Sequence, residues 1–169
     1  MNNLINIYSK SFTLLNQYDE NKISTIKGTK SIFILDYEEA KKEISKLKQF
    51  LIQKEEASEL FGLEKDNGFK ALIKNIYQSF DRIDLLPSIE EKAANLLYYI
   101  VKDHPFIDGN KRIGAFLFVL FLDKNNHLYD NTGNLKINPN GLVSLTLFVA
   151  NSRAEEKELV VRLIMNFIK

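Results

Sequence analysis

The sequence predicts an all-α fold, a helical bundle in one compact domain with a small β-hairpin. Apolar residues recur at helical spacing along most of the chain, and several of these segments begin with a capping signature. The length of 169 residues and the hydrophobic content of 45% suit one well-packed domain and are too small for two of ordinary size.

The N-terminal third of the chain predicts two helices separated by a hairpin. Residues 4–18 carry apolar side chains at helical spacing, which predicts the first helix. The stretch NKISTIKGTKSIFIL, residues 21–35, contains two β-prone runs around Gly28 and predicts a hairpin. Asp36 and Glu39 form a capping-box signature for a long helix over about 37–57.

In the rest of the chain, glycine, proline and helix-capping residues mark where the predicted helices begin and end. Residues 61–69, FGLEKDNGF, predict a loop, and a helix follows near 70–80. Ser88 and Glu91 form a second capping box. The further predicted helices cover 89–102, 111–124, 140–150 and 153–168, the last of them capped by Ser152 and Glu155.

Composition excludes several classes of function. The 23 basic and 22 acidic side chains nearly cancel, so we expect no direct binding to nucleic acid or to a membrane surface. The absence of cysteine excludes disulfides and thiolate metal sites and fits a reducing cytosol. The N-terminus lacks the pattern of a signal peptide, and the apolar run 113–122 has about half the ~20 residues that span a bilayer. We therefore expect a cytoplasmic protein.

One stretch, KDHPFIDGNKRIGAFLFVLFLDKN at 102–125, carries most of the chemistry. A buried helix that begins near Asn110 presents unpaired amides and the positive end of its dipole, which together bind anions such as phosphate. Gly109 lets a phosphate approach the backbone closely. Lys111 and Arg112 add charged donors at the same place.

A base and a metal ligand precede this helix. His104, with an unperturbed pKa of ~6.5, can accept a proton near neutral pH. Asp108 is a hard oxygen ligand that can hold Mg²⁺ against phosphates. Phe106 alternates with these polar residues and is expected to anchor the loop in the core. Base, metal ligand and phosphate cradle are the groups that phosphoryl or nucleotidyl transfer requires.

The segment HPFIDGNKR, residues 104–112, resembles the signature of the Fic/Doc family. The likeness extends over FGLEKDNGFKALIKNIYQSF and LLPSIEEKAANLLYYIVKDHPFIDGNKR to the Doc-like and virulence-associated branch, covering residues 58–125. It implies the Fic fold, with 58–169 as the family core. Residues 1–57 resemble the family more weakly and are expected to hold an N-terminal helix, a hairpin and a long helix, in part as an extension of the same compact domain.

The resemblance also implies an activity: AMP passes from ATP to a hydroxyl of a target protein, with Mg²⁺ as cofactor. His104 would take the hydroxyl proton and Asp108 would hold the Mg²⁺. Gly109, Asn110 and Lys111 would line the phosphate cradle, and Arg112 would bind the outer phosphates. The segment expected to align a target strand, the flap, comprises Phe61, Gly62, Leu63, Glu64, Lys65, Asp66, Asn67, Gly68 and Phe69.

Two departures from the Fic pattern leave the reaction open. Ala115 stands where the pattern has a second arginine, and Lys111 stands where many AMP transferases have glycine. Lysine at that place resembles Doc, whose chemistry is phosphorylation, whereas Gly109 resembles Fic. We favour AMP transfer, with γ-phosphate transfer or a catalytically weak binding module as alternatives. Lys111 could also be an ordinary solvated lysine.

Regulation and partners are open as well. The sequence SRAEE, residues 152–156, has the spacing of the family's inhibitory segment, but Ser152 and Glu155 are better explained as a helix cap. The expected target is a protein with a serine, threonine or tyrosine hydroxyl. If this chain is a toxin-like regulator, a separate antitoxin-like protein is expected to inhibit it. Whether the chain forms homo-oligomers is left open. His127 is predicted to be a surface loop residue, and Gly114 a close-packing site.

Overall fold

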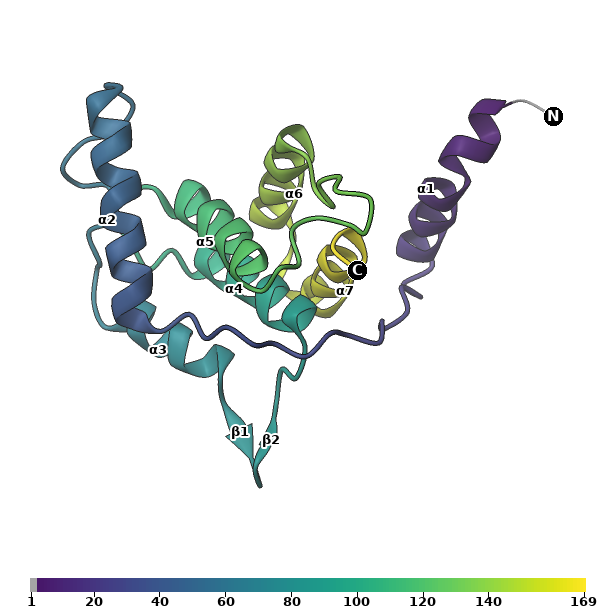
Figure 1. Cartoon of the computed structure of the whole chain (residues 1–169), viewed down its shortest axis with the longest axis horizontal. Coiled ribbons are helices and arrows are strands. Elements are labelled where there is room, and N and C mark those ends of the chain that lie inside the picture. The colour runs from purple at the N-terminus through teal and green to yellow at the C-terminus, as the bar shows by residue number, and fades with distance from the viewer. Residues whose placement is uncertain (1–2) are drawn as a thin grey trace.

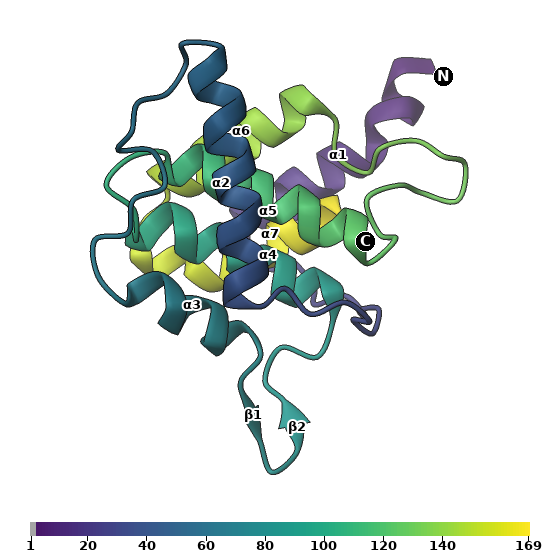
Figure 2. The same cartoon turned by 60° about the vertical axis from the view of Figure 1, so that its left-hand side comes forward.

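The computed structural model describes residues 3–169 and confirms the all-α prediction (Figure 1). The helices are α1 (Asn3–Asp19), α2 (Tyr37–Gln53), α3 (Gly68–Ile76), α4 (Ile89–Asp103), α5 (Asn110–Lys124), α6 (Pro139–Asn151) and α7 (Lys157–Phe167), with a short 3₁₀ turn at Ala154–Glu156. The strands β1 (Ser79–Phe80) and β2 (Ile83–Asp84) form an antiparallel hairpin that projects from the body (Figure 2). Within the described residues, no helix is long and apolar enough to cross a membrane.

Helix α4 forms the centre of the core. It packs against α5, α7, α3 and α6, and eleven of its fifteen residues are buried. Helix α5 lies along it, and the contact is close at Gly114, where an added Cβ would lie 3.0 Å from Cγ2 of Val101. This confirms Gly114 as a close-packing site. Helix α5, which follows the α4–α5 loop, is therefore held by close packing against the core helix α4.

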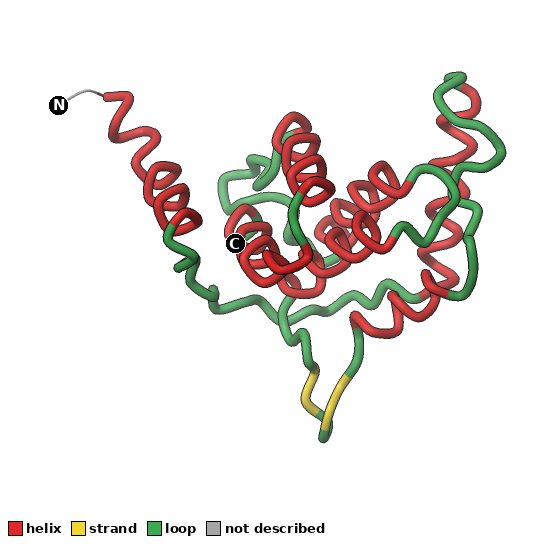
Figure 3. The backbone as a smooth tube through the Cα atoms, turned by 180° about the vertical axis from the view of Figure 1, so that it is seen from behind, coloured by secondary structure: helices red, strands yellow, loops and turns green. Residues whose placement is uncertain are grey.

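Helix α1 contributes little to this core. None of its residues is buried, and Figures 1 and 3 show it standing apart from the other helices. Near its end, the Tyr18 ring meets the Phe148 ring of α6 edge to face, with 5.7 Å between the centroids.

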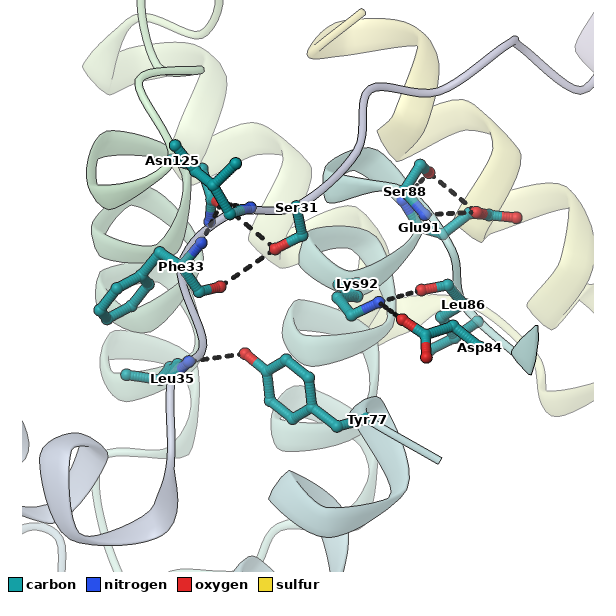
Figure 4. Close-up of polar contacts among 11 residues, drawn as sticks. Ser31, Phe33, Leu35, Tyr77, Asp84, Leu86, Ser88, Glu91, Lys92 and Asn125 are labelled. Carbon is teal, nitrogen blue, oxygen red and sulfur yellow. Dashed lines mark hydrogen bonds and ion pairs between the residues drawn. The ribbon is translucent and has the colours of Figure 1, made fainter. Parts of the chain in front are cut away.

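The hairpin predicted over residues 21–35 is wrong. Residues 22–35, which we call the strap, cross the ends of the core helices as a single extended segment (Figures 3 and 4). Side chains from the core accept the main-chain N–H groups that a hairpin would pair between its own arms. These bonds run from Thr29 to Glu90 (2.8 Å), from Ile32 and Phe33 to Asn125 (3.0 Å each) and from Leu35 to the hydroxyl of Tyr77 (2.7 Å). Burial raises the pKa of Tyr77 to about 12, so this hydroxyl stays neutral.

The observed hairpin lies instead at residues 79–84, where helix 70–80 was predicted to end. Helix α3 stops at Ile76, and the turn places Asp81 and Arg82 at positive φ, 49° and 66°. Both central residues of a type I′ hairpin turn require positive φ, a conformation that usually selects asparagine or glycine. The sequence DR therefore gave no turn signal.

Two of the three predicted caps are present. Ser88 Oγ accepts from Glu91 N (3.1 Å) while the Glu91 carboxylate accepts from Ser88 N (3.0 Å), which is a complete capping box. Asp36 Oδ1 accepts from Glu39 N (2.8 Å), and its helix ends at Gln53 instead of near 57.

The predicted cap at Ser152 and Glu155 is wrong by one residue. The Ser152 hydroxyl donates backwards to the carbonyl of Val149 (2.7 Å). Arg153 N donates to the Glu156 carboxylate (2.9 Å) and opens the 3₁₀ turn. Helix α6 reaches Asn151, so Ser152 still belongs to its C-terminal end and cannot also open the next helix.

The prediction for His127 is also wrong, because its side chain is buried. Its Nε2 lies 2.9 Å from Oε1 of Glu90, whose side chain is 2% exposed. Burial alone would raise the pKa of Glu90, but hydrogen bonds from His127 and from the main chain of Thr29 lower it to about 2. Lys136 Nζ lies 3.1 Å from the same imidazole nitrogen. A carboxylate on α4 thus ties the strap to the loop after α5.

Candidate active site

The loop between α4 and α5 carries the predicted site residues to one pocket of about 360 Å³. The pocket is lined by His104, Ile107, Asp108, Gly109, Asn110, Lys111 and Arg112. The loop joins the C-terminal end of one core helix to the N-terminal end of the next, so both walls of the pocket are fixed by the core.

His104 stands at the wall formed by the end of α4. It is the C-cap residue of that helix in the left-handed conformation, with φ 49° and ψ 56°, and its side chain is exposed. Pro105 follows and has no N–H with which to continue the helix. No other described residue hydrogen-bonds the imidazole, so it is available to a substrate.

Gly109 is the residue on which the geometry of the loop depends. Its φ is +89°, and a Cβ built there would lie 2.4 Å from Cε2 of the Phe61 ring. Phe61 is itself 1% exposed and has no room to retreat. Glycine is thus required both by the backbone conformation and by the close approach of the ring.

Replacing Gly109 by alanine is expected to lower the free energy of unfolding by about 1–3 kcal/mol and to weaken ATP binding, because the loop must move away from Phe61. Thermal unfolding and calorimetric titration with Mg-ATP measure the two effects. Gly133→Ala is the matched control: its φ is +83° but nothing lies within 4 Å of the added Cβ. Equal ATP binding by wild type and Gly109→Ala would contradict the prediction.

Asn110 holds the loop in shape. Its side-chain oxygen accepts from Phe106 N (2.9 Å) and its nitrogen donates to Phe106 O (2.8 Å). Phe106 is buried and its ring meets that of Phe69 with 4.8 Å between centroids, so it anchors the loop as the sequence predicted. The side-chain amide of Asn110 is therefore committed to the loop, whereas its main-chain N–H has no acceptor among the described residues.

The N-terminus of α5 provides donors for an anion. The first main-chain bond of the helix joins Ile113 N to Gly109 O at 2.8 Å. Among residues 3–169, no acceptor binds the main-chain N–H groups of Asn110, Lys111 and Arg112. Three unpaired amides and the positive end of the helix dipole therefore lie at residues that line the pocket, an arrangement that can bind an anion.

Asp108 and Arg112 form an ion pair at the edge of the pocket. Arg112 Nη2 lies 3.4 Å from Asp108 Oδ2, and Arg112 Nη1 donates to the carbonyl of Glu56 (2.7 Å). The guanidinium also lies 4.7 Å from the centroid of the Phe61 ring. Glu56 lies 56 residues away along the chain, so no local sequence pattern identifies it as a partner of Arg112. To reach a phosphate, Arg112 must exchange these contacts for the ligand.

The residues present fit a magnesium ion only together with phosphate. No group of three or more acidic, histidine or cysteine side chains gathers as a metal cage in the described part of the chain. Asp108 is a single half-exposed carboxylate beside the anion site. Mg²⁺ typically binds through one or two carboxylates plus substrate phosphates, which this arrangement can supply.

Lys111 lies at the mouth of the pocket with an exposed side chain, and none of the described residues pairs with it. It also borders an apolar hollow of about 210 Å³ between α5 and α6 that the sequence analysis missed. The other residues that line this hollow are Arg112, Ala115, Leu142, Val143, Thr146 and Leu147. Val143 and Leu147 are exposed and four residues apart on α6, so their spacing could have indicated an apolar surface on this helix.

Residues 61–69 lie beside the motif loop and pair with it. Gly62 N donates to Asp108 O (3.1 Å), Lys65 N to Pro105 O (3.0 Å), and Leu63 O accepts from Ile107 N (2.8 Å). Gly68 and Phe69 belong to α3, so the loop itself ends at Asn67. The segment therefore flanks the site where a target strand was expected, while these main-chain groups are already paired.

The segment 152–156 does not reach the pocket. Both carboxylate oxygens of Glu156 bind Arg153, at 2.9 Å to its main-chain nitrogen and 3.1 Å to its guanidinium. The structure thus gives no contact between this segment and the motif.

An exposed histidine, a half-exposed carboxylate and a helix N-terminus thus line one pocket of a helical domain. Residues 36–122 match the model of the Fic/DOC family, and the chain belongs to this family. Members are typically transferases that move a nucleotide or phosphate group onto proteins. No curated protein and no solved structure matches the chain.

Proposed function

We propose that this protein transfers AMP from ATP to a hydroxyl side chain of a target protein. The observation that supports it best is the position of His104, exposed and without a hydrogen-bond partner among residues 3–169, in the same pocket as the unpaired amides of α5. A base and an anion site on opposite walls leave room between them for an attacked phosphorus atom.

In the proposed reaction, His104 takes the proton of the target hydroxyl as its oxygen attacks the α-phosphorus. The bond from that phosphorus to the bridging oxygen breaks, and pyrophosphate leaves. The amides of Lys111 and Arg112 hold the negative charge on the outer phosphates. Asp108 would hold Mg²⁺, which supplies positive charge between the phosphates.

Phosphorylation is the second candidate, and the unpaired Lys111 beside Ala115 supports it. A bulky cation at the mouth of the pocket can favour the entry of ATP in the opposite sense, which would place the γ-phosphate next to His104. Transfer assays with ATP labelled at the α- or the γ-phosphate separate the two reactions. Label from the α-phosphate alone supports AMP transfer, and label from the γ-phosphate alone overturns it.

Replacing Lys111 by glycine is expected to keep label transfer from the α-phosphate and to weaken ATP binding, because charge-assisted hydrogen bonds of roughly 1–3 kcal/mol are lost. Calorimetry with Mg-ATP and the two labelled substrates measure both effects. Lys111→Met is the matched control, since it removes the charge and keeps the bulk. A change of product in the glycine variant alone would show that bulk sets the orientation of ATP. Unchanged binding in both variants would make Lys111 an ordinary solvated lysine.

A catalytically weak binding module is the third candidate, because Ala115 removes one expected phosphate ligand. Calorimetry distinguishes it: the enzyme proposal requires that Mg-ATP binds. We also propose that control comes from a separate, antitoxin-like protein, and the engagement of Glu156 with Arg153 supports control in trans over control by segment 152–156.

A further inference from the structure

A cavity of about 660 Å³ lies away from the motif, between the strap, the β1–β2 hairpin and the N-terminus of α4. Ser88, at the start of α4, lines it, whereas His104 lies at the other end of that helix. A helix of fifteen residues is about 22 Å long, so the two pockets are separate.

The floor of this cavity is polar and fully paired. Lys92 is buried, and its ammonium binds Asp84 Oδ2 (3.1 Å) and the carbonyl of Leu86. Figure 4 shows Lys92 between the strap and the segment that follows the hairpin, with Tyr77 beside it. The positive charge of Lys92 is thus neutralised within the protein, and the floor is rigid.

The rim of the cavity, in contrast, carries two cations without partners. Lys30 on the strap and Arg82 at the tip of the hairpin both line the cavity, and no carboxylate of the described residues lies within ion-pair distance of either. Arg82 holds a left-handed conformation, φ 66°, that side chains with a Cβ rarely adopt. Although Arg82 lies in the turn between β1 and β2, it lines the same cavity as Asp84 of β2.

The strap adds exposed apolar side chains at a spacing of two. Ile32 and Ile34 are 73% and 66% exposed, while Phe33 and Leu35 face inward, and Lys30 continues the outward row. An extended peptide presents side chains at this same spacing. The strap is placed here by Gly28, because a Cβ at that residue would lie 2.1 Å from Cβ of Ser88.

We propose that this cavity is a docking site for an extended segment of a partner protein that carries carboxylates next to apolar side chains. The carboxylates would pair with Lys30 and Arg82, and the apolar side chains would cover Ile32 and Ile34. Two unpaired cations are too few for a polyanion, since nucleic-acid binding typically uses about 6–10 phosphate contacts and anionic membranes about 4–8 clustered basic residues. The proposal does not depend on the reaction proposed for the motif.

Peptide display on the whole chain, without ATP, tests the site. Panning a random peptide library is expected to enrich sequences with acidic and apolar residues at alternate positions. The double variant Lys30→Glu with Arg82→Glu should bind these peptides roughly tenfold more weakly, because two attractions become repulsions. Ile34→Ser should also weaken them. Lys10→Glu with Lys42→Glu changes the same total charge on exposed helical surface and should have no effect.

Each contrary result overturns the docking proposal. Peptides that lack acidic residues, or that bind the double variant as well as wild type, would show that the rim cations recognise nothing. Enrichment of acidic peptides without apolar residues would reduce the site to an anion site. Binding of phosphatidylserine vesicles in place of peptides would point to a membrane, and a dimer that dissociates in the double variant would point to a second copy. If charge reversal lowers the Tm, Lys30→Gln with Arg82→Gln takes its place.

Discussion

Replacing His104 by alanine is expected to lower the rate of transfer by about 10²–10⁴-fold, since a positioned general base contributes an acceleration of this size. The melting temperature should stay unchanged, because the imidazole is exposed and binds no other described residue. Labelled ATP with a target protein measures the first effect, and thermal unfolding measures the second.

The chain provides a matched control, because its only other histidine has the opposite environment. His127 is buried against Glu90, so His127→Ala should lower the melting temperature and leave the transfer rate unchanged at temperatures where the protein is folded. Full transfer activity in His104→Ala would remove the base from the mechanism. A loss of both folding and activity in that variant would give His104 a structural role.

Replacing Glu90 by glutamine is expected to lower the free energy of unfolding by about 3 kcal/mol near neutral pH. The carboxylate is 2% exposed and accepts hydrogen bonds from His127 and from the main chain and hydroxyl of Thr29. Glutamine keeps the shape of the side chain but loses its charge. Its NH₂ group also replaces one acceptor oxygen, so it would lie against the groups of His127 and Thr29 that now donate to the carboxylate. For a domain of this size the melting temperature should fall by roughly 6–12 °C. Glu59→Gln, at a carboxylate that is 85% exposed, is the control and should change little.

The difference in unfolding free energy between wild type and Glu90→Gln is also expected to depend on pH. The pKa of Glu90 is lowered to about 2 from the ordinary value of 4.5, so its contribution to stability is present above about pH 4.5. Below that pH the unfolded state takes up the proton first, and the contribution disappears as the pH falls to about 2. The difference in unfolding free energy between wild type and Glu90→Gln should therefore shrink over this range in denaturant titrations. A difference that stays constant from neutral pH to about pH 2 would contradict the assignment of Glu90.

The features that were predicted correctly rest on contacts close in sequence. The capping box of Ser88 and Glu91 and the start of α5 near Asn110 each depend on residues within a few positions. Such contacts are encoded by local residue types and spacing, so a single sequence is enough to find them. This is why the sequence could predict that His104, Asp108 and the first residues of α5 lie together, as they do around one pocket.

The path of the strap and the burial of His127 were missed because they depend on partners far away along the chain. The strap has the composition of a hairpin, but Glu90 and Asn125 supply its acceptors; strand propensity predicts an extended chain and does not identify its partner. His127 is buried only because Glu90 lies opposite to it.

The sequence by itself determined the order of the core helices and the position of residues 104–112 at the junction of two of them. Only the tertiary structure decided that Arg112 donates to the carbonyl of Glu56, that residues 61–65 pair with the motif loop, and that Lys30 and Arg82 line a second cavity. Helices and caps form from hydrogen bonds between near neighbours, whereas these contacts exist only after packing of the core has brought distant segments together.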